Sequence, residues 1–236
     1  MRKVLYLLDL MRIRDRMIWT FFLDNMNRNI NQIIKELADD YMCKLKKQVS
    51  VRMSEMKNDD TSHWLVYRVL GVSDDEGKLI DEYQNKGRFL YKYAGSFLEE
   101  AAMLCFKYKF PKASKFMIPN KDGVRPKNYE IDCLVGKIAY EIKWRDATTD
   151  GDHITKEHNR VKSIREAGYE PYRIMFYYPL REQAIKIQKT LETLYKGIGG
   201  KYIYGDAAWG YIKEVTGVDL LGVLQTIAKE RENVVQ

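Results

Sequence analysis

Residues 130–143 of the chain have the sequence EIDCLVGKIAYEIK, and this stretch decides the fold. Glycine at the first central position is typical of a two-residue type II′ turn, so Gly136 and Lys137 are predicted to close a β-hairpin. Val135 then pairs with Ile138 across the turn. Since the register of a hairpin follows from its turn, this pair fixes which of the remaining side chains face each other.

The predicted register gives the hairpin one polar and one apolar face. Asp132 lies opposite Glu141, and side chains alternate along a strand, so the next polar pair has the same orientation. That pair is Glu130 with Lys143. The other face is expected to hold Ile131, Cys133, Val135, Ile138, Tyr140 and Ile142. Such a hairpin either forms a catalytic site or is an amphipathic structural element with a cross-strand ion pair.

Two acids and a lysine on one face suit the cleavage of a phosphodiester bond. Mg²⁺ prefers oxygen ligands and is usually held by one or two carboxylates, here Asp132 and Glu141, together with water and phosphate oxygens. Lys143 is placed to orient the attacking water and to stabilise charge that develops on the phosphate. Closely spaced acids repel each other, so at least one of them is expected to have a raised pKa without the metal.

The segments around the hairpin predict an α/β fold. Upstream, apolar residues recur at helical spacing over residues 87–110, and this helix contains two acids, Glu99 and Glu100. The other predicted elements are a strand near 114–118, a helix over 154–167 that Gly168 ends, and a strand over 171–179. Together they predict a central mixed sheet flanked by helices.

The pattern Asp132-(x8)-Glu141-x-Lys143 resembles the PD-(D/E)xK nuclease superfamily, with Ile131 in the position of the proline. The resemblance implies a restriction-endonuclease-like αβββαβ core, which the predicted element order matches. It also implies that the helix before the hairpin supplies another carboxylate to the metal. Gly95-(x3)-Glu99 resembles that element, which makes Glu99 the expected ligand and Glu100 the reserve, with Glu130 a further candidate.

Three further segments resemble the ApaLI-like group of type II restriction endonucleases, within a region from residue 129 to about residue 228. They are EIKWRDATTDGDHITKEHNR, EAGYEPYRIMFYYPLREQAIKIQKTLETLYKGIGG and YGDAAWGYIKEVTG. This resemblance implies a Mg²⁺-dependent homodimer that cuts double-stranded DNA at a palindromic site. A cognate DNA methyltransferase is then expected in the same prokaryotic host.

Candidate DNA contacts follow the hairpin. Residues 144–152 predict a polar loop at the edge of the site, in which Arg145, Thr148 and Thr149 can contact phosphate or base edges. In the helix after the loop, Lys156 and Arg160 are four residues apart and therefore share a face. The alternatives are an ordinary connecting loop and a solvated helix face.

The N-terminal part differs in pattern from the rest of the chain. Apolar residues recur at three- and four-residue steps over residues 1–57, which predicts helices, and residues 64–72 predict a strand between turn signals at 58–60 and 73–77. We therefore expect two parts: residues 1–84 as a mostly helical extension for dimerisation or DNA contact, and residues 85–236 as the nuclease core with C-terminal helices.

Composition agrees with a DNA-binding protein of the cytoplasm. Lys and Arg number 40 against 33 Asp and Glu, a net charge of +7 that favours a polyanionic partner. Cys43, Cys105 and Cys133 form no CxxC pair and have apolar neighbours, so they are expected to be reduced core thiols. The sequence predicts neither a signal peptide nor a membrane span.

Other chemistries fit less well. His153 and His158 are five residues apart, which places them on different faces of a helix and disfavours a zinc site. Two alternatives remain open: a structure-specific repair nuclease or junction resolvase with the same core, and a non-catalytic DNA-binding module in which the acid hairpin is structural.

Overall fold

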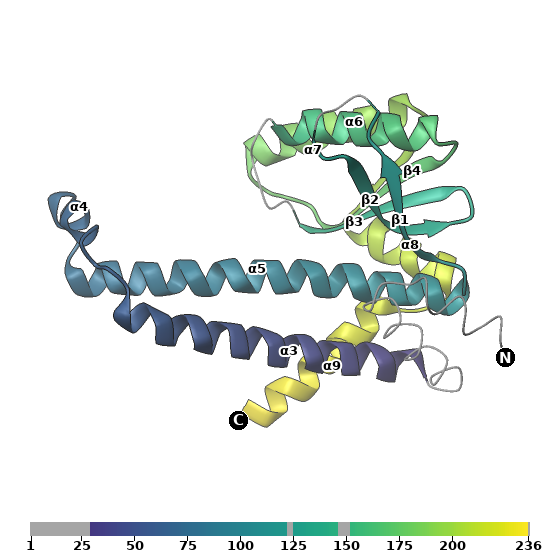
Figure 1. Cartoon of the computed structure of the whole chain (residues 1–236). Helices are drawn as coiled ribbons and strands as arrows, with labels where there is room; N and C mark the ends of the chain where they lie inside the picture. The colour runs from purple at the N-terminus through teal and green to yellow at the C-terminus, as the bar shows by residue number, and fades with distance from the viewer. Residues whose placement is uncertain (1–28, 122–124, 146–151, 236) are drawn as a thin grey trace, which may run out of the picture.

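The computed structural model describes residues 29–121, 125–145 and 152–235 of the chain. Two long helices, α3 (Ile30–Glu55) and α5 (Asp74–Lys109), lie side by side and form an arm. They are joined through the short helices η1 (Met56–Asn58) and α4 (Trp64–Val69). Figure 1 shows α4 at the end of the arm and the sheet above the C-terminal part of α5.

The sheet has five strands in the order β1-β2-β3-β4-β5. Their bounds are Ser114–Pro119 (β1), Asn128–Val135 (β2), Ile138–Arg145 (β3), Glu170–Tyr177 (β4) and Lys201–Tyr204 (β5). Strand β2 is antiparallel to both β1 and β3, while β4 and β5 continue the sheet in parallel from β3. The mixed sheet confirms the predicted α/β class, and β5 is a strand that the sequence pattern did not predict.

Helices cover both faces of the sheet. On one face lie α6 (Asp152–Glu166) and α7 (Glu182–Gly197), and on the other lie α5 and α8 (Asp206–Thr216). The last helix, α9 (Leu220–Val235), returns to α3. The order from α5 to β4 is helix, three strands, helix and strand, so the predicted αβββαβ core is confirmed.

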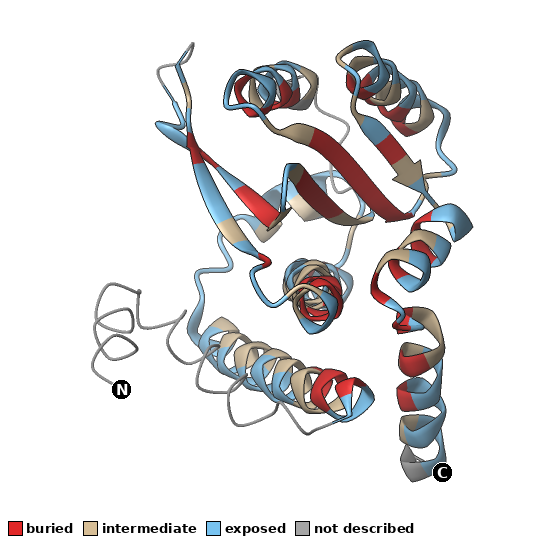
Figure 2. Ribbon diagram, turned by 90° about the vertical axis from the view of Figure 1, so that its right-hand side faces the viewer, coloured by how far each residue is buried: buried red, intermediate tan, exposed pale blue. Residues whose placement is uncertain are grey.

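The core is divided by the sheet, as Figure 2 shows from the buried middle strands and the facing sides of the helices. On the α5 side, Tyr140 and Ile142 of β3 pack against residues 98–106, and the Tyr140 ring stacks on Phe106 with centroids 4.4 Å apart. On the α6 side, Met175 of β4 packs against α6 and α7. Each large apolar side chain buried in this way contributes about 1.5–3 kcal/mol.

The hairpin of β2 and β3 has the turn that the sequence predicted. Gly136 has a φ of +58°, and no other type of residue in the described ranges has a positive φ, so Lys137 fits the second position of a type II′ turn. Val135 pairs with Ile138 and Cys133 with Tyr140, which confirms the predicted register next to the turn.

Strand β2 contains an irregularity that the sequence did not reveal. The pairing of β1 with β2 shifts between Ser114 and Phe116, where Asp132 and Cys133 lie against the single residue Lys115. This is a β-bulge, which adds one residue to a strand and changes the direction of a side chain. The bulge therefore lies at Asp132, one of the two hairpin acids predicted to bind the metal.

The bulge changes which residues share a face. Cys133 packs on the α5 side of the sheet, whereas Ile131 packs on the α6 side with Ile118 and Ala139. The prediction that Ile131 and Cys133 lie on one apolar face was therefore wrong. An extra residue between strand partners shifts the alternation by one, so Ile131 and Cys133 face opposite sides of the sheet although they are two residues apart.

The predicted strand at 64–72 is the helix α4. Trp64 Nε1 and Tyr67 Oη both donate hydrogen bonds to the Asp81 carboxylate, at 3.0 and 2.9 Å. Residues three apart meet on one side of a helix but would diverge in a strand, so contacts with α5 decide the local structure here.

The predicted turn at 73–77 is the start of α5. The Ser73 side chain accepts a hydrogen bond from the Glu76 backbone N–H at 3.2 Å, and three acids occupy the first helical turn. The helix is thus longer than the 87–110 expected, and it runs without a break across the expected division at residues 84 and 85.

Other expectations can be compared directly. Gly168, with a φ of +84°, follows α6 as predicted, and β4 coincides with the predicted strand at 171–179. Helix α3 confirms a helical N-terminal part from residue 30 onward, while residues 1–28 lie outside the described ranges.

Cys105 and Cys133 are buried free thiols, but Cys43 is exposed, so its prediction as a core thiol was wrong. None of the helices that the structure describes has both the length and the apolar character needed to cross a bilayer.

Candidate active site

The bulge and the neighbouring strand fix the position of Asp132. The regular pairing of β2 with β3 ends at Cys133 and Tyr140, and beyond it Asp132 Oδ2 accepts a hydrogen bond from the Ile142 N–H at 2.7 Å. The carboxylate is nearly buried and is held by backbone on its partner strand. Glu141, the adjacent residue on β3, is also buried. The two predicted metal ligands therefore lie on neighbouring strands and share a contact with Lys143, but Glu141 is not among the described acids whose oxygens gather within reach of one ion.

Helix α5 supplies a further acid to the same place. One carboxylate oxygen each from Glu99, Glu130 and Asp132 lies within 4.8 Å of the others, a spacing that a single cation can bridge. Glu100 has a different environment, because its Oε2 accepts a hydrogen bond from the Tyr41 hydroxyl of α3 at 2.7 Å. Glu99, and not the reserve residue Glu100, is the helix acid that lies beside the hairpin acids.

Lys143 contacts both hairpin acids. Its Nζ lies 2.5 Å from Glu141 Oε1 and 3.6 Å from Asp132 Oδ2. The expected partner Glu130 instead pairs with Lys115, at 3.0 Å. The prediction that Glu130 faces Lys143 was therefore wrong, because the bulge at Asp132 ends the one-to-one pairing before it reaches Glu130. We call Glu99, Glu130, Asp132, Glu141 and Lys143 the acid site.

Two cations that were not assigned to the catalytic group also belong to its surroundings. Lys115 of β1 lies 2.5 Å from Glu99 Oε1 and bridges to Glu130. Arg160 of α6 forms an ion pair with Glu141 Oε1. Lys115 could have been suspected from the sequence, since the strand predicted at 114–118 had to lie beside the hairpin. Arg160 was predicted as a DNA contact on an exposed face, and here it is turned into the acid site.

Burial and neighbouring charges give the two hairpin acids very different pKa values. Burial, together with the negative charge of Glu141, raises the pKa of Asp132 to about 7. For Glu141, burial also acts to raise the pKa, but Lys143 and Arg160 outweigh it and hold the value at about 2. The expectation that one acid has a raised pKa is confirmed, and the acid is Asp132.

A group of buried charged side chains lies next to Glu141 and supports the acid site. Glu157 of α6 pairs with Arg173 of β4 at 3.1 Å and also accepts a hydrogen bond from the Tyr195 hydroxyl. Arg173 stands beside Glu141 in the parallel register of β3 and β4, and Arg160 pairs with Glu157 at 3.5 Å. The group thus connects α6, α7 and β4 to the acid site.

The acid site fits a hard divalent cation. Glu141 Oε2 is buried and has no hydrogen-bond partner within the described ranges. Each lysine ammonium, of Lys115 and of Lys143, is shared by two carboxylates, as expected where negative charge gathers. All donors are carboxylate oxygens, and neither histidine nor cysteine belongs to the described acid cluster, so the set suits Mg²⁺, Mn²⁺ or Ca²⁺ rather than zinc.

Of the candidate DNA contacts, Arg160 contacts the acid site through Glu141. Arg145, at the end of β3, lies over the Tyr91 ring at 5.3 Å and the Trp144 ring at 5.5 Å. Lys156 is exposed on α6, while Thr148 and Thr149 lie outside the described residues.

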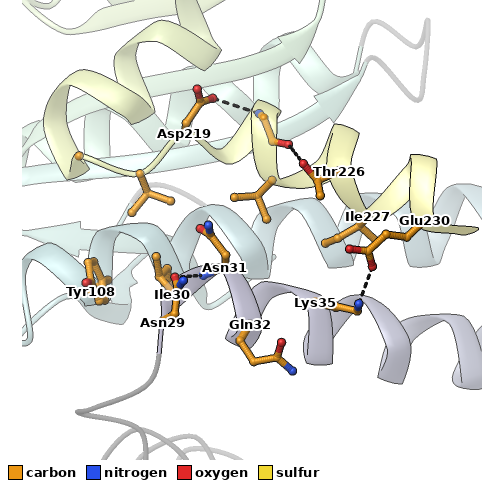
Figure 3. Close-up of a pocket in the computed structure, with 14 residues that line it drawn as sticks. Asn29, Ile30, Asn31, Gln32, Lys35, Tyr108, Asp219, Thr226, Ile227 and Glu230 are labelled. Carbon is orange, nitrogen blue, oxygen red and sulfur yellow. Dashed lines mark hydrogen bonds and ion pairs between the residues drawn. The ribbon is translucent and has the colours of Figure 1, made fainter.

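A hollow of about 700 Å³ between α3 and α9 is separate from the site (Figure 3). Its two acids, Asp219 and Glu230, already pair with lysines.

A mixed sheet whose bulged hairpin brings acids and a lysine together, with a carboxylate from the preceding helix, has the architecture of the restriction-endonuclease-like fold. The chain belongs to the ApaLI-like restriction endonuclease family, whose model matches residues 23–229. The match extends well beyond the C-terminal half in which the resemblance was visible, and it includes α3 and α5. No curated protein and no solved structure matches the chain.

Proposed function

We propose that this chain is a type II restriction endonuclease that hydrolyses both strands of double-stranded DNA at a short palindromic site with Mg²⁺. The observation that carries the proposal is the contact of Lys143 with Asp132 and Glu141 beside Glu99, in a chain of a restriction endonuclease family. The lysine and the acids share one site, as in-line attack of water on a phosphate requires.

Asp132 and Glu99 are the residues that would hold the ion, with Glu130 from the same cluster as a further oxygen donor. Glu141, which shares Lys143 with Asp132, is the other proposed donor. A bound Mg²⁺ would supply Lewis acidity to the scissile phosphate and lower the pKa of a water molecule. The backbone N–H of Ile142 keeps the Asp132 carboxylate in place, so the ligand geometry is set before DNA arrives. Burial of both hairpin acids excludes bulk water and strengthens their interaction with a cation.

Lys143 has the role of orienting the attacking water and stabilising charge on the phosphate. The two carboxylates raise the pKa of its ammonium, although burial acts in the opposite direction, so the group is cationic at neutral pH. It is a proton donor in hydrogen bonds rather than a free base. Arg160 provides a second positive charge on Glu141 from the α6 side.

DNA binding and assembly complete the proposal. The proposed DNA contacts are Arg145, Lys156, Thr148, Thr149 and Arg160. A palindromic target has two-fold symmetry, so a homodimer presents one equivalent set of contacts to each half. The enzyme would work in the cytoplasm of a prokaryotic cell, with a cognate DNA methyltransferase that protects the host sequence.

Digestion of plasmid DNA with Mg²⁺ and with EDTA tests the function. Discrete fragments with Mg²⁺ only, whose sequenced ends share one short palindrome, are expected. Glu141→Gln should lower the cleavage rate by about 10³-fold or more while DNA binding persists. Glu182→Gln removes a carboxylate that is 83% exposed on α7 and should cleave normally.

Three results would contradict the proposal. A Glu141→Gln protein that cuts at the rate of the unmodified protein would remove the acid from the mechanism. A smear, or cleavage restricted to branched DNA, would indicate a repair nuclease or junction resolvase. Binding without Mg²⁺-dependent cleavage of unmethylated DNA from several genomes would indicate a non-catalytic module.

A further inference from the structure

Helix α5 continues far beyond the part that the sheet covers. Its buried residues are Gly77, near its start, and a group at 98–106 beneath the sheet. Glu99 lies at the start of this buried group in the sequence. The N-terminal part of α5 projects beyond the sheet as part of the arm (Figure 1). The arm therefore begins directly at the acid site.

Two cations on the arm are in line with Glu99. Lys92 and Arg88 precede it by seven and eleven residues, which is close to two and three turns of helix, so all three share a face. Both cations are exposed, and neither forms an ion pair with a carboxylate in the part of the chain that the structure describes. By contrast, Lys86 on the other side of the helix pairs with Glu82 at 3.3 Å.

The same stretch of helix has a hollow without acids. A depression of about 570 Å³ is lined by Tyr83, Gln84, Asn85, Gly87, Arg88 and Tyr91. A side chain at Gly87 would meet no described atom within 4 Å, so the backbone is open to close approach. Polar donors and one guanidinium around an open glycine suit a polyanion better than an apolar partner.

The hairpin contributes a third cation to this region. Arg145 lies over the Tyr91 ring at 5.3 Å, and the Tyr91 and Trp144 rings are 5.4 Å apart. The two rings, which are tilted by 43° to each other, hold the guanidinium between α5 and the end of β3, two residues beyond Lys143. Arg145, Lys92 and Arg88 therefore form a positive path that leads from the acid site along the arm.

We propose that Arg88 and Lys92 of α5, continued by Arg145, bind the phosphate backbone of the DNA strand that leaves the active site. This inference rests on the proposed function. With a rise of 1.5 Å per residue, Lys92 is about 10 Å and Arg88 about 16 Å from Glu99 along the helix. At 3.4 Å per base pair, these contacts fall about three and five base pairs from the scissile phosphate.

The test compares single and double alanine variants by the salt dependence of DNA binding. Fluorescence anisotropy with a random-sequence 30-base-pair duplex in EDTA measures binding without cleavage. Lys92→Ala should reduce the slope of log K against log salt by about 1, and the Arg88→Ala/Lys92→Ala protein by about 2. Lys86→Ala is the matched control, because it removes a lysine of the same helix from another face and should leave the slope unchanged.

Duplex length gives a second readout. With the palindrome identified from the sequenced fragment ends, affinity of the unmodified protein should rise until the flank reaches about five base pairs beyond the cut, and then level off. The double variant should gain nothing from the same extension. Circular dichroism and melting temperature show whether the variants fold, and both side chains are exposed, so folding should be unaffected.

The outcomes separate this inference from the proposed function. Cleavage with an unchanged salt slope in the double variant overturns the inference and leaves the function intact. If the unmodified protein shows no Mg²⁺-dependent cleavage, the proposed function is overturned, and a reduced slope in the double variant then supports only the phosphate binding by Arg88 and Lys92. If the variants dissociate a dimer during sedimentation but keep the slope, this face binds a second copy of the chain and the inference fails.

Discussion

Lys115 Nζ lies 2.5 Å from Glu99 Oε1, so strand β1 places an ammonium group against the acid that α5 contributes to the site. The same ammonium lies 3.0 Å from Glu130 Oε1. It therefore balances two members of the three-acid cluster at the place where a divalent cation would bind. Metal and lysine are expected to compete for Glu99.

Replacement of Lys115 by methionine should strengthen metal binding. The acids then lose their internal cation, and the affinity for Ca²⁺ measured by titration calorimetry should rise by about tenfold, the size of one charge-assisted contact. Lys112→Met is the control, since Lys112 is exposed and forms no ion pair within the described residues. Weaker Ca²⁺ binding by Lys115→Met would show that the lysine organises the acids instead.

Asp132 should make the stability of the metal-free protein depend on pH. Its pKa is about 7 in the folded protein and about 4 when unfolded, so between these values the unfolded chain has lost a proton that the folded protein keeps. Stability attributable to this group therefore falls as pH rises from about 4 to 7, and the loss is complete above 7.

The variant Asp132→Asn cannot ionise and avoids this loss. In EDTA at pH 8 it should melt at a higher temperature than the unmodified protein, and the difference should vanish near pH 4. Added Mg²⁺ should raise the melting temperature of the unmodified protein but not of the variant. The control Glu232→Gln replaces an exposed acid and keeps Asp132, so it should melt like the unmodified protein at both pH values. Equal melting of Asp132→Asn and the unmodified protein at pH 8 would contradict the assignment.

The buried pair of Arg173 and Glu157 should be essential for stability. Both side chains are at most 10% exposed, so Arg173→Met leaves an uncompensated buried carboxylate and should cost about 3–5 kcal/mol in urea unfolding. The double variant Glu157→Leu/Arg173→Met should recover part of this loss. Lys186→Met removes an exposed cation from α7 and should change stability by less than about 0.5 kcal/mol. A loss below about 1 kcal/mol in Arg173→Met would mean that water reaches the pair.

The hairpin could be predicted because its information is local. Gly136 fixes the turn, the turn fixes the register, and the register places Asp132 and Glu141 on neighbouring strands. Lys143 lies two residues after Glu141, so its position on the same face of the strand follows from the alternation of side chains alone. No other part of the chain is needed to infer that these three side chains lie near each other.

The bulge could not be predicted, because it depends on how β1 pairs with β2. Ser114 pairs with Leu134 but Phe116 pairs with Ile131, a shift that follows from packing between distant segments. The contact of Glu130 with Lys115 is a consequence of the same pairing. Long-range packing also explains α4, where Asp81 accepts hydrogen bonds from Trp64 and Tyr67 and selects a helix in place of the predicted strand.

Two of the glycines of α5, Gly77 and Gly87, should respond in opposite ways to substitution by alanine. A Cβ at Gly77 would lie 2.7 Å from Tyr67 Cδ2, and the Tyr67 ring is tied to Asp81 by its hydroxyl, so Gly77→Ala should destabilise the end of the arm by about 1–2 kcal/mol. A Cβ at Gly87 meets no described atom, so Gly87→Ala should stabilise the helix by about 0.5–1 kcal/mol. Hydrogen exchange of residues 64–90 measures both effects, and faster exchange in Gly87→Ala would show that this face packs against something that the substitution displaces.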